Sequence, residues 1–250
     1  MSELITNLNN ILDIKGNIKS AIENKGVDMT GVSFPGYASK IGEISVGGGW
    51  DQKSITEKSY EIINLDNSAS FVASYAFTFT NIKTVNLPYA TTVGFSAFYG
   101  CTSLSQVSLP MCSSIGTNTF YHCTSLTQIS LPMCSYISAN AFQYCSSLSQ
   151  VSLPMCSYIS SYAFDGCSLL SRVSLPKCSY IGGYTFRNCS SLSIITIGYS
   201  SVCSLKNSNA FTITQITSST GSIYVPASLV DSYKSATNWS YFSTQIFPIE

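Results

Sequence analysis

The chain has 250 residues, and its 12 basic and 12 acidic side chains cancel, so that charged residues make up only 10% of the sequence. A nucleic-acid-binding protein needs a basic excess to displace counterions from phosphates, which argues against that class. No apolar run approaches the roughly 18 residues of a membrane span, and residues 1–20 are polar where a signal peptide needs an apolar stretch. We therefore expect no membrane insertion and no export by a visible signal.

Residues 1–46 are predicted to form a helical module for oligomerisation or attachment. Apolar residues recur there at steps of four and three, with one polar member: Leu4, Leu8, Ile11, Lys15, Ile18 and Ile22. This spacing is typical of a short coiled coil whose polar core position sets the register or the number of strands. It favours a homo-oligomer, for which we guess a trimer, or attachment to another protein. The alternative is that the helix packs on residues 27–46 of its own chain.

Three glycines at positions 47–49 predict a flexible linker between two parts of the chain. Residues 50–87 are then expected to hold an N-terminal cap and one degenerate repeat. Residues 198–250 are expected to hold another degenerate repeat, which begins out of phase at Ala210, and a C-terminal cap. In that cap we expect a last strand at residues 223–225 and a short amphipathic helix at residues 227–236.

Regular repeats of 22 residues cover residues 88–197. One unit reads F-x-x-C-x-S-L-x-x-V-x-L-P-x-C-x-x-I, and its phenylalanines are Phe98, Phe120, Phe142, Phe164 and Phe186. A single unit cannot bury its own apolar residues, so successive units must stack, with leucine on leucine and phenylalanine on phenylalanine. Residues such as Val107 and Leu109 alternate with polar neighbours, as in a half-buried strand. The expected fold is a β-rich solenoid that follows an N-terminal α-helical segment.

The pattern L-x-x-V-x-L resembles a leucine-rich repeat, and the longer unit is similar to the BspA-like subfamily of bacterial surface proteins and some phage proteins. The likeness is close over residues 82–197 and looser over residues 59–226. The segment ILDIKGNIKSAIENKGVDMTGVSFPGYASKIGEI, residues 11–44, resembles a module at the start of phage tail and other virion proteins. The ending IYVPASLVDSYKSATNWS resembles that of many leucine-rich repeat proteins of gut bacteria and their phages. These likenesses imply a context and no chemistry.

The ten cysteines are expected to be buried thiols that pack as small apolar residues. Nine of them, from Cys101 to Cys189, lie 11 residues apart, which places two in every repeat. Cys203 lies out of this register, and we expect it to be exposed. No C-x-x-C pair occurs and His122 is the only histidine, so we predict no metal site and no cofactor.

Residues for catalysis are scarce in the repeats. His122 occupies a variable position and is expected to be an exposed turn residue, and Asp165 is the only acidic residue of the regular repeats. Paired carboxylates are therefore absent there, and no G-x-S-x-G motif or phosphate-binding glycine loop accompanies the many serines. We predict that the chain is not an enzyme.

Ligand specificity is expected in the repeat positions that vary, because packing explains those that do not. Around each phenylalanine these positions are rich in tyrosine, serine and asparagine, the residues that dominate antibody paratopes. The predicted binding residues are Tyr99, Tyr121, Tyr144, Tyr162, Tyr184 and Arg187. The strand face with Gln106, and a tyrosine ladder at residues 136, 158 and 180, are further candidates, the ladder with a purely structural role as its alternative.

Three functions remain open. The first is a phage virion protein of the tail or head fibre or spike type, assembled in the host cytoplasm, whose repeats bind a host surface protein or glycan. The second is a bacterial cell-surface adhesin. The third is an architectural capsid or tail decoration protein with no host ligand.

Overall fold

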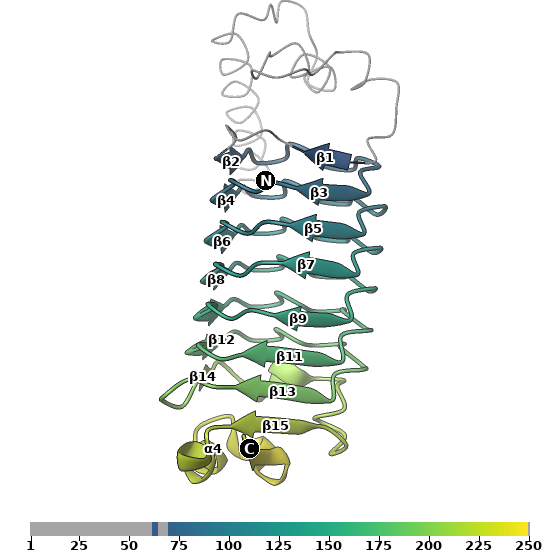
Figure 1. Ribbon diagram of the computed structural model, residues 1–250. Coiled ribbons are helices and arrows are strands. Elements are labelled where there is room, and N and C mark those ends of the chain that lie inside the picture. Colours follow the sequence, from purple (N-terminus) through teal and green to yellow (C-terminus); the bar gives the residue numbers. More distant parts are fainter. Residues whose placement is uncertain (1–61, 65–69, 250) are drawn as a thin grey trace, which may run out of the picture. The chain divides into compact units, whose positions relative to one another are not determined.

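The computed structural model describes residues 62–64 and 70–249, and these form a solenoid with two walls of parallel strands (Figure 1). The first wall contains two sheets, ordered β1-β3-β5-β7 and β16-β15-β13-β11-β9. Its strands are β1 (Ile62–Asn64), β3 (Thr84–Asn86), β5 (Gln106–Ser108), β7 (Gln128–Ser130), β9 (Gln150–Ser152), β11 (Arg172–Leu175), β13 (Ile194–Ile197), β15 (Ser222–Val225) and β16 (Ile246–Pro248).

The second wall is a single sheet of two-residue strands, ordered β14-β12-β10-β8-β6-β4-β2. Its strands are β2 (Phe71–Val72), β4 (Thr92–Val93), β6 (Ser114–Ile115), β8 (Tyr136–Ile137), β10 (Tyr158–Ile159), β12 (Tyr180–Ile181) and β14 (Ser204–Leu205). Every strand pairs in parallel with the equivalent strand of the next coil, so the predicted solenoid is confirmed.

The pairing register equals the sequence repeat. Val107 of β5 lies between Val85 of β3 and Ile129 of β7, one 22-residue repeat away on either side. The register breaks only near the C-terminal end, where Tyr180 of β12 pairs with Ser204 of β14. The chain between these two strands is longer than one repeat, which explains why the unit around Phe211 is out of phase in the sequence.

The core is built from ladders of identical side chains. Rings from Phe77 to Phe211, one from each coil, stack with centroids 5.1–5.8 Å apart and planes within 12° of parallel. The rings from Phe98 to Phe211 are fully buried. Burying a side chain of this size contributes about 1.5–3 kcal/mol, and offset stacking adds to it.

The ten cysteines are all free and buried, as the repeat spacing predicts for nine of them. One ladder donates to the carbonyl of the preceding coil's phenylalanine, as Cys145 Sγ does to the Phe120 oxygen at 3.1 Å. The expectation that Cys203 is exposed is wrong. The cap covers this residue: its backbone N–H donates to Tyr233 Oη at 2.8 Å, and its carbonyl accepts from Trp239 Nε1 at 2.6 Å.

The C-terminal cap closes the phenylalanine ladder. It consists of the 3₁₀ helices η2 (Ser208–Phe211), η3 (Ala227–Leu229) and η4 (Ser240–Gln245) and the helix α4 (Val230–Ser235). Trp239 and Phe242 pack on the Phe211 ring, with centroids at 5.9 and 5.2 Å. The predicted strand at residues 223–225 is confirmed as β15, but it is not the last one, because β16 pairs with it.

Several predictions lie outside the described residues: the helical module 1–46, the linker 47–49, and residues 50–61 and 65–69 of the N-terminal cap. Within the described part of the chain, no helix has the length and apolar character needed to cross a membrane.

Candidate binding surface

Each coil passes from the second wall back to the first through a tight turn centred on the ladder phenylalanine. The residues two before and two after that phenylalanine have left-handed φ angles between +51° and +76° in five consecutive coils. Backbone hydrogen bonds join the turns: the N–H groups of Ser96, Phe98 and Gly100 donate to the next coil at 3.0, 2.9 and 2.8 Å. The intervening residue, such as Tyr99, is partly exposed beside them. The variable positions of the repeats therefore lie on one continuous row of turns.

Three of the predicted tyrosines form a cluster on this row. Tyr99 and Tyr121 stack with centroids 4.7 Å apart, and Tyr144 meets Tyr121 edge to face at 5.6 Å. His122 is exposed, as predicted, and its ring lies 6.2 Å from that of Tyr144. Burial, and to a smaller extent the neighbouring phenols, raise the pKa of Tyr121. The cluster presents aromatic rings that already hold one another in place.

Glycine at position 166 lets the Tyr144 ring extend onto the next coil. Gly166 has a φ of +76°, and a Cβ atom there would lie 2.5 Å from Tyr144 Cδ1. Such a contact is too short for any side chain, so only glycine accommodates both the backbone angle and the ring.

The other half of the row is organised by Asp165, whose side chain is fully buried. Its Oδ1 accepts from Arg187 Nε and Asn188 Nδ2, both at 3.0 Å. Its Oδ2 accepts from Arg187 Nη2 at 2.7 Å and from Gln143 Nε2 at 2.8 Å. Four donors from the coils on either side satisfy the carboxylate, which removes most of the penalty for burying it.

Arg187 is held in a single position by this carboxylate and by two tyrosines. Its guanidinium carbon lies 5.2 Å from the ring centroids of both Tyr162 and Tyr184, within cation–π range. The two rings stack on each other at 5.0 Å. The hydrogen bonds from Asp165 are the main cause of the raised pKa of Arg187. The result is a permanent positive charge with little freedom to move.

All six predicted binding residues thus lie on one row of turns, which we call the tyrosine–arginine surface: Tyr99, Tyr121, Tyr144, Tyr162, Tyr184 and Arg187. Sequence reasoning missed the positioning role of Gln143, Asp165 and Asn188. The signal was present, since Asp165 and Arg187 occupy the same position in successive repeats.

Elsewhere, the tyrosine ladder predicted as an alternative is present on the second wall. Tyr158 stacks on Tyr136 at 5.0 Å and on Tyr180 at 4.4 Å. Among residues 62–64 and 70–249, no group of three or more His, Cys, Asp or Glu side chains is placed to hold a metal ion.

Comparison with known proteins identifies the repeats. A family model described as BspA type leucine rich repeat region matches in six copies, over residues 52–156 and 113–232. The chain belongs to this family. BspA-type repeats therefore account for the row of turns as well as for the two walls. No curated protein sequence matches the chain significantly.

Solved structures of leucine-rich repeat proteins are similar to parts of the chain. A T. pallidum leucine-rich repeat protein is 32% identical, with a TM-score of 0.46, over 54% of this chain and 66% of that one. A leucine-rich cell surface protein of Faecalibacterium prausnitzii is 22% identical, with a TM-score of 0.44, over 59% and 49%. One from Bacteroides ovatus is 23% identical, with a TM-score of 0.45, over 57% and 46%. The chain spans about half to two thirds of the length of these relatives.

Proposed function

We propose that the chain is a non-enzymatic binding protein whose tyrosine–arginine surface recognises a partner protein outside the cell. The observation that carries the proposal is the immobilised Arg187, held between Asp165 and the stacked rings of Tyr162 and Tyr184.

Immobilised aromatic and guanidinium groups favour binding for an energetic reason. Ordering a side chain at an interface costs about 0.5–1.5 kcal/mol, and the hydrogen bonds and ring contacts of this surface already meet that cost in the free protein. Tyrosine and arginine are also the residues that most often dominate protein interfaces. The guanidinium retains N–H donors beyond the two that bind Asp165, so a partner can hydrogen-bond to a fixed cation.

The proposed location is the surface of a bacterial cell, which is how the F. prausnitzii relative is described. The virion assignment came from residues 11–44, and homo-oligomerisation from residues 4–22, all outside the described part of the chain. Both remain predictions from the sequence.

The experiment measures binding of the fluorescently labelled full chain to intact epithelial cells and to intact bacteria, each untreated, protease-treated or glycosidase-treated. The proposal predicts saturable binding to epithelial cells that protease treatment abolishes. The variant Tyr121→Ala should weaken it by about tenfold or more, as expected for an interface hot spot.

Tyr158→Ala provides a matched control, because Tyr158 belongs to a stacked tyrosine ladder on the other wall. Binding that survives protease but not glycosidase would replace the protein partner with a glycan. Binding to bacteria alone would favour the virion protein. Absence of binding to either cell type would contradict the proposal and favour the architectural role.

A further inference from the structure

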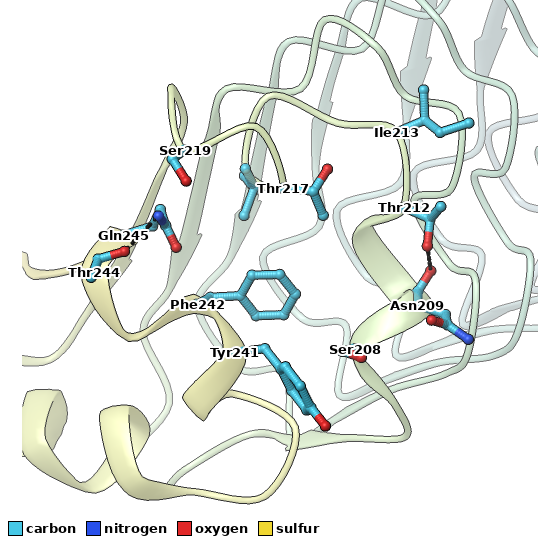
Figure 2. A pocket seen from close by; sticks show the side chains of 11 residues that line it. Ser208, Asn209, Thr212, Ile213, Thr217, Ser219, Tyr241, Phe242, Thr244 and Gln245 are labelled. Atoms are coloured by element: carbon cyan, nitrogen blue, oxygen red, sulfur yellow. Dashed lines mark hydrogen bonds between the residues drawn. The ribbon is translucent and has the colours of Figure 1, made fainter.

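We propose that a pocket beside the C-terminal cap binds a neutral saccharide. The pocket has a volume of about 510 Å³ and lies between η2 with the turn that follows it and η4 (Figure 2). Its size falls in the range of small-molecule sites, which is about 300–1,000 Å³.

The pocket continues the row of turns into the last coil. Asn188 N–H donates to the Thr212 carbonyl at 2.9 Å, which puts Thr212 in the place that Arg187 occupies one coil earlier. Asn209, which lines the pocket, donates from Nδ2 to Tyr184 Oη at 3.2 Å. The pocket is therefore next to the tyrosine–arginine surface but is lined by different residues.

The lining is rich in groups that both donate and accept hydrogen bonds, and it contains no charged residue. Hydroxyls come from residues such as Thr212 and Thr217, and amides from Asn209 and Gln245. Gln245 is only 7% exposed, and its Nε2 donates to Thr244 Oγ1 at 2.7 Å. No described group donates to its Oε1, which leaves an acceptor for a ligand hydroxyl. Sugar hydroxyls match such a lining, whereas a charged ligand would lose its hydration without gaining a counter-charge.

An aromatic platform completes the site. Tyr241 is 74% exposed at the rim, and the buried Phe242 ring points into the space between Tyr241 and Thr217 (Figure 2). The C–H face of a pyranose ring packs on an exposed aromatic face while its hydroxyls reach the polar groups around it. A solvent-exposed tyrosine next to amides and hydroxyls is suited to a neutral sugar.

The opposite rim is held by Ile213 in a strained conformation. This residue is 62% exposed and has a φ of +59°, which is a genuine outlier for a β-branched side chain. Strain of this kind concentrates at ligand-binding sites. Ile213 places a second apolar surface at the rim, near the turn that carries Thr212.

The test uses the full chain and isothermal titration with maltotriose, cellotriose and mannotriose, with sialyllactose and a heparin tetrasaccharide as charged comparisons. At least one neutral trisaccharide should bind, and both charged ones should bind more weakly. Tyr241→Ala should weaken binding by about tenfold or more, whereas Tyr241→Phe should stay close to the wild type, because stacking needs the ring. Since Tyr241 is exposed, the melting temperature of Tyr241→Ala should match that of the wild type.

Tyr121→Ala separates this site from the proposed function, because it alters the tyrosine–arginine surface and should leave saccharide binding unchanged. Conversely, Tyr241→Ala should leave the protease-sensitive binding to epithelial cells unchanged. The proposal is overturned if no neutral trisaccharide binds, if the charged ones bind better, or if Tyr121→Ala rather than Tyr241→Ala abolishes binding.

Discussion

Arg187 and Asp165 hold the same position in successive coils, and their ion pair of 2.7 Å has one buried and one accessible side: the carboxylate is fully buried, while the guanidinium side chain is 31% exposed. The pair connects two coils through side chains, in addition to the backbone ladder between them. Because the hidden charge is the negative one, removing the arginine is expected to cost more than a surface ion pair would.

Arg187→Ala should lower the free energy of unfolding by about 2–3 kcal/mol. Removing one partner of a fully buried pair costs about 3–5 kcal/mol, and the loss is smaller here because the guanidinium is partly exposed and two amides still donate to Asp165. Urea denaturation measures the change. Arg172→Ala, at an exposed strand position, is the control and should stay within about 0.5 kcal/mol. A double-mutant cycle with Asp165→Ala should give a coupling of about 1–3 kcal/mol, and additive effects would refute the interaction.

Gly166→Ala should destabilise the protein through both backbone angle and contact. An alanine in the left-handed region costs about 1–2 kcal/mol, and its Cβ would also collide with the Tyr144 ring. In the Tyr144→Ala background only the backbone cost remains, so the same substitution should be less harmful there, as thermal melts of the four proteins would show. His122→Ala, at an equivalent position that already tolerates a side chain at a φ of +60°, should have little effect. Equal costs in both backgrounds would show that the ring contact is unimportant.

Phe142→Ala should cost about 3–5 kcal/mol, because it leaves a cavity between the buried rings of Phe120 and Phe164. In a solenoid each coil is stabilised by its neighbours, so amide hydrogen exchange should accelerate most in the coils adjacent to Phe142. Tyr144→Ala, two residues away on an exposed ring, should cost far less. Uniform acceleration that includes the C-terminal cap would argue against nearest-neighbour stabilisation.

Stability should fall in alkali, and Cys134 should account for a measurable part of the slope. Burial raises the pKa of Cys134 from 9.0 to about 12. Between these pH values the unfolded chain loses this thiol proton while the folded chain keeps it, so stability decreases as the pH rises. The contribution is about 1.4 kcal/mol per pH unit. Urea denaturation from pH 8 to pH 11 should therefore give a shallower decline for Cys134→Ala. Ser135→Ala is the control, and parallel curves for all three proteins would contradict the shift.

Much of this fold could be predicted because the repeats say the same thing several times. The phenylalanine positions predict a ring ladder, and the strands lie where the alternation at Val107 and Leu109 predicts them. Cys203 was misjudged because its burial depends on Tyr233 and Trp239, whose positions follow from how the cap folds back rather than from any local pattern.

The sequence by itself determined the period, the residues that face the core and the family, because each repeat must bury the same side chains against its neighbours. It also placed six candidate binding residues in the variable positions. Only the tertiary structure decided that Asp165 holds Arg187 between two tyrosines, and that Asn209, Thr212 and Tyr241 meet around one pocket. These relationships join residues in different coils, or in a coil and the cap, and they depend on side-chain directions that a repeat pattern does not specify.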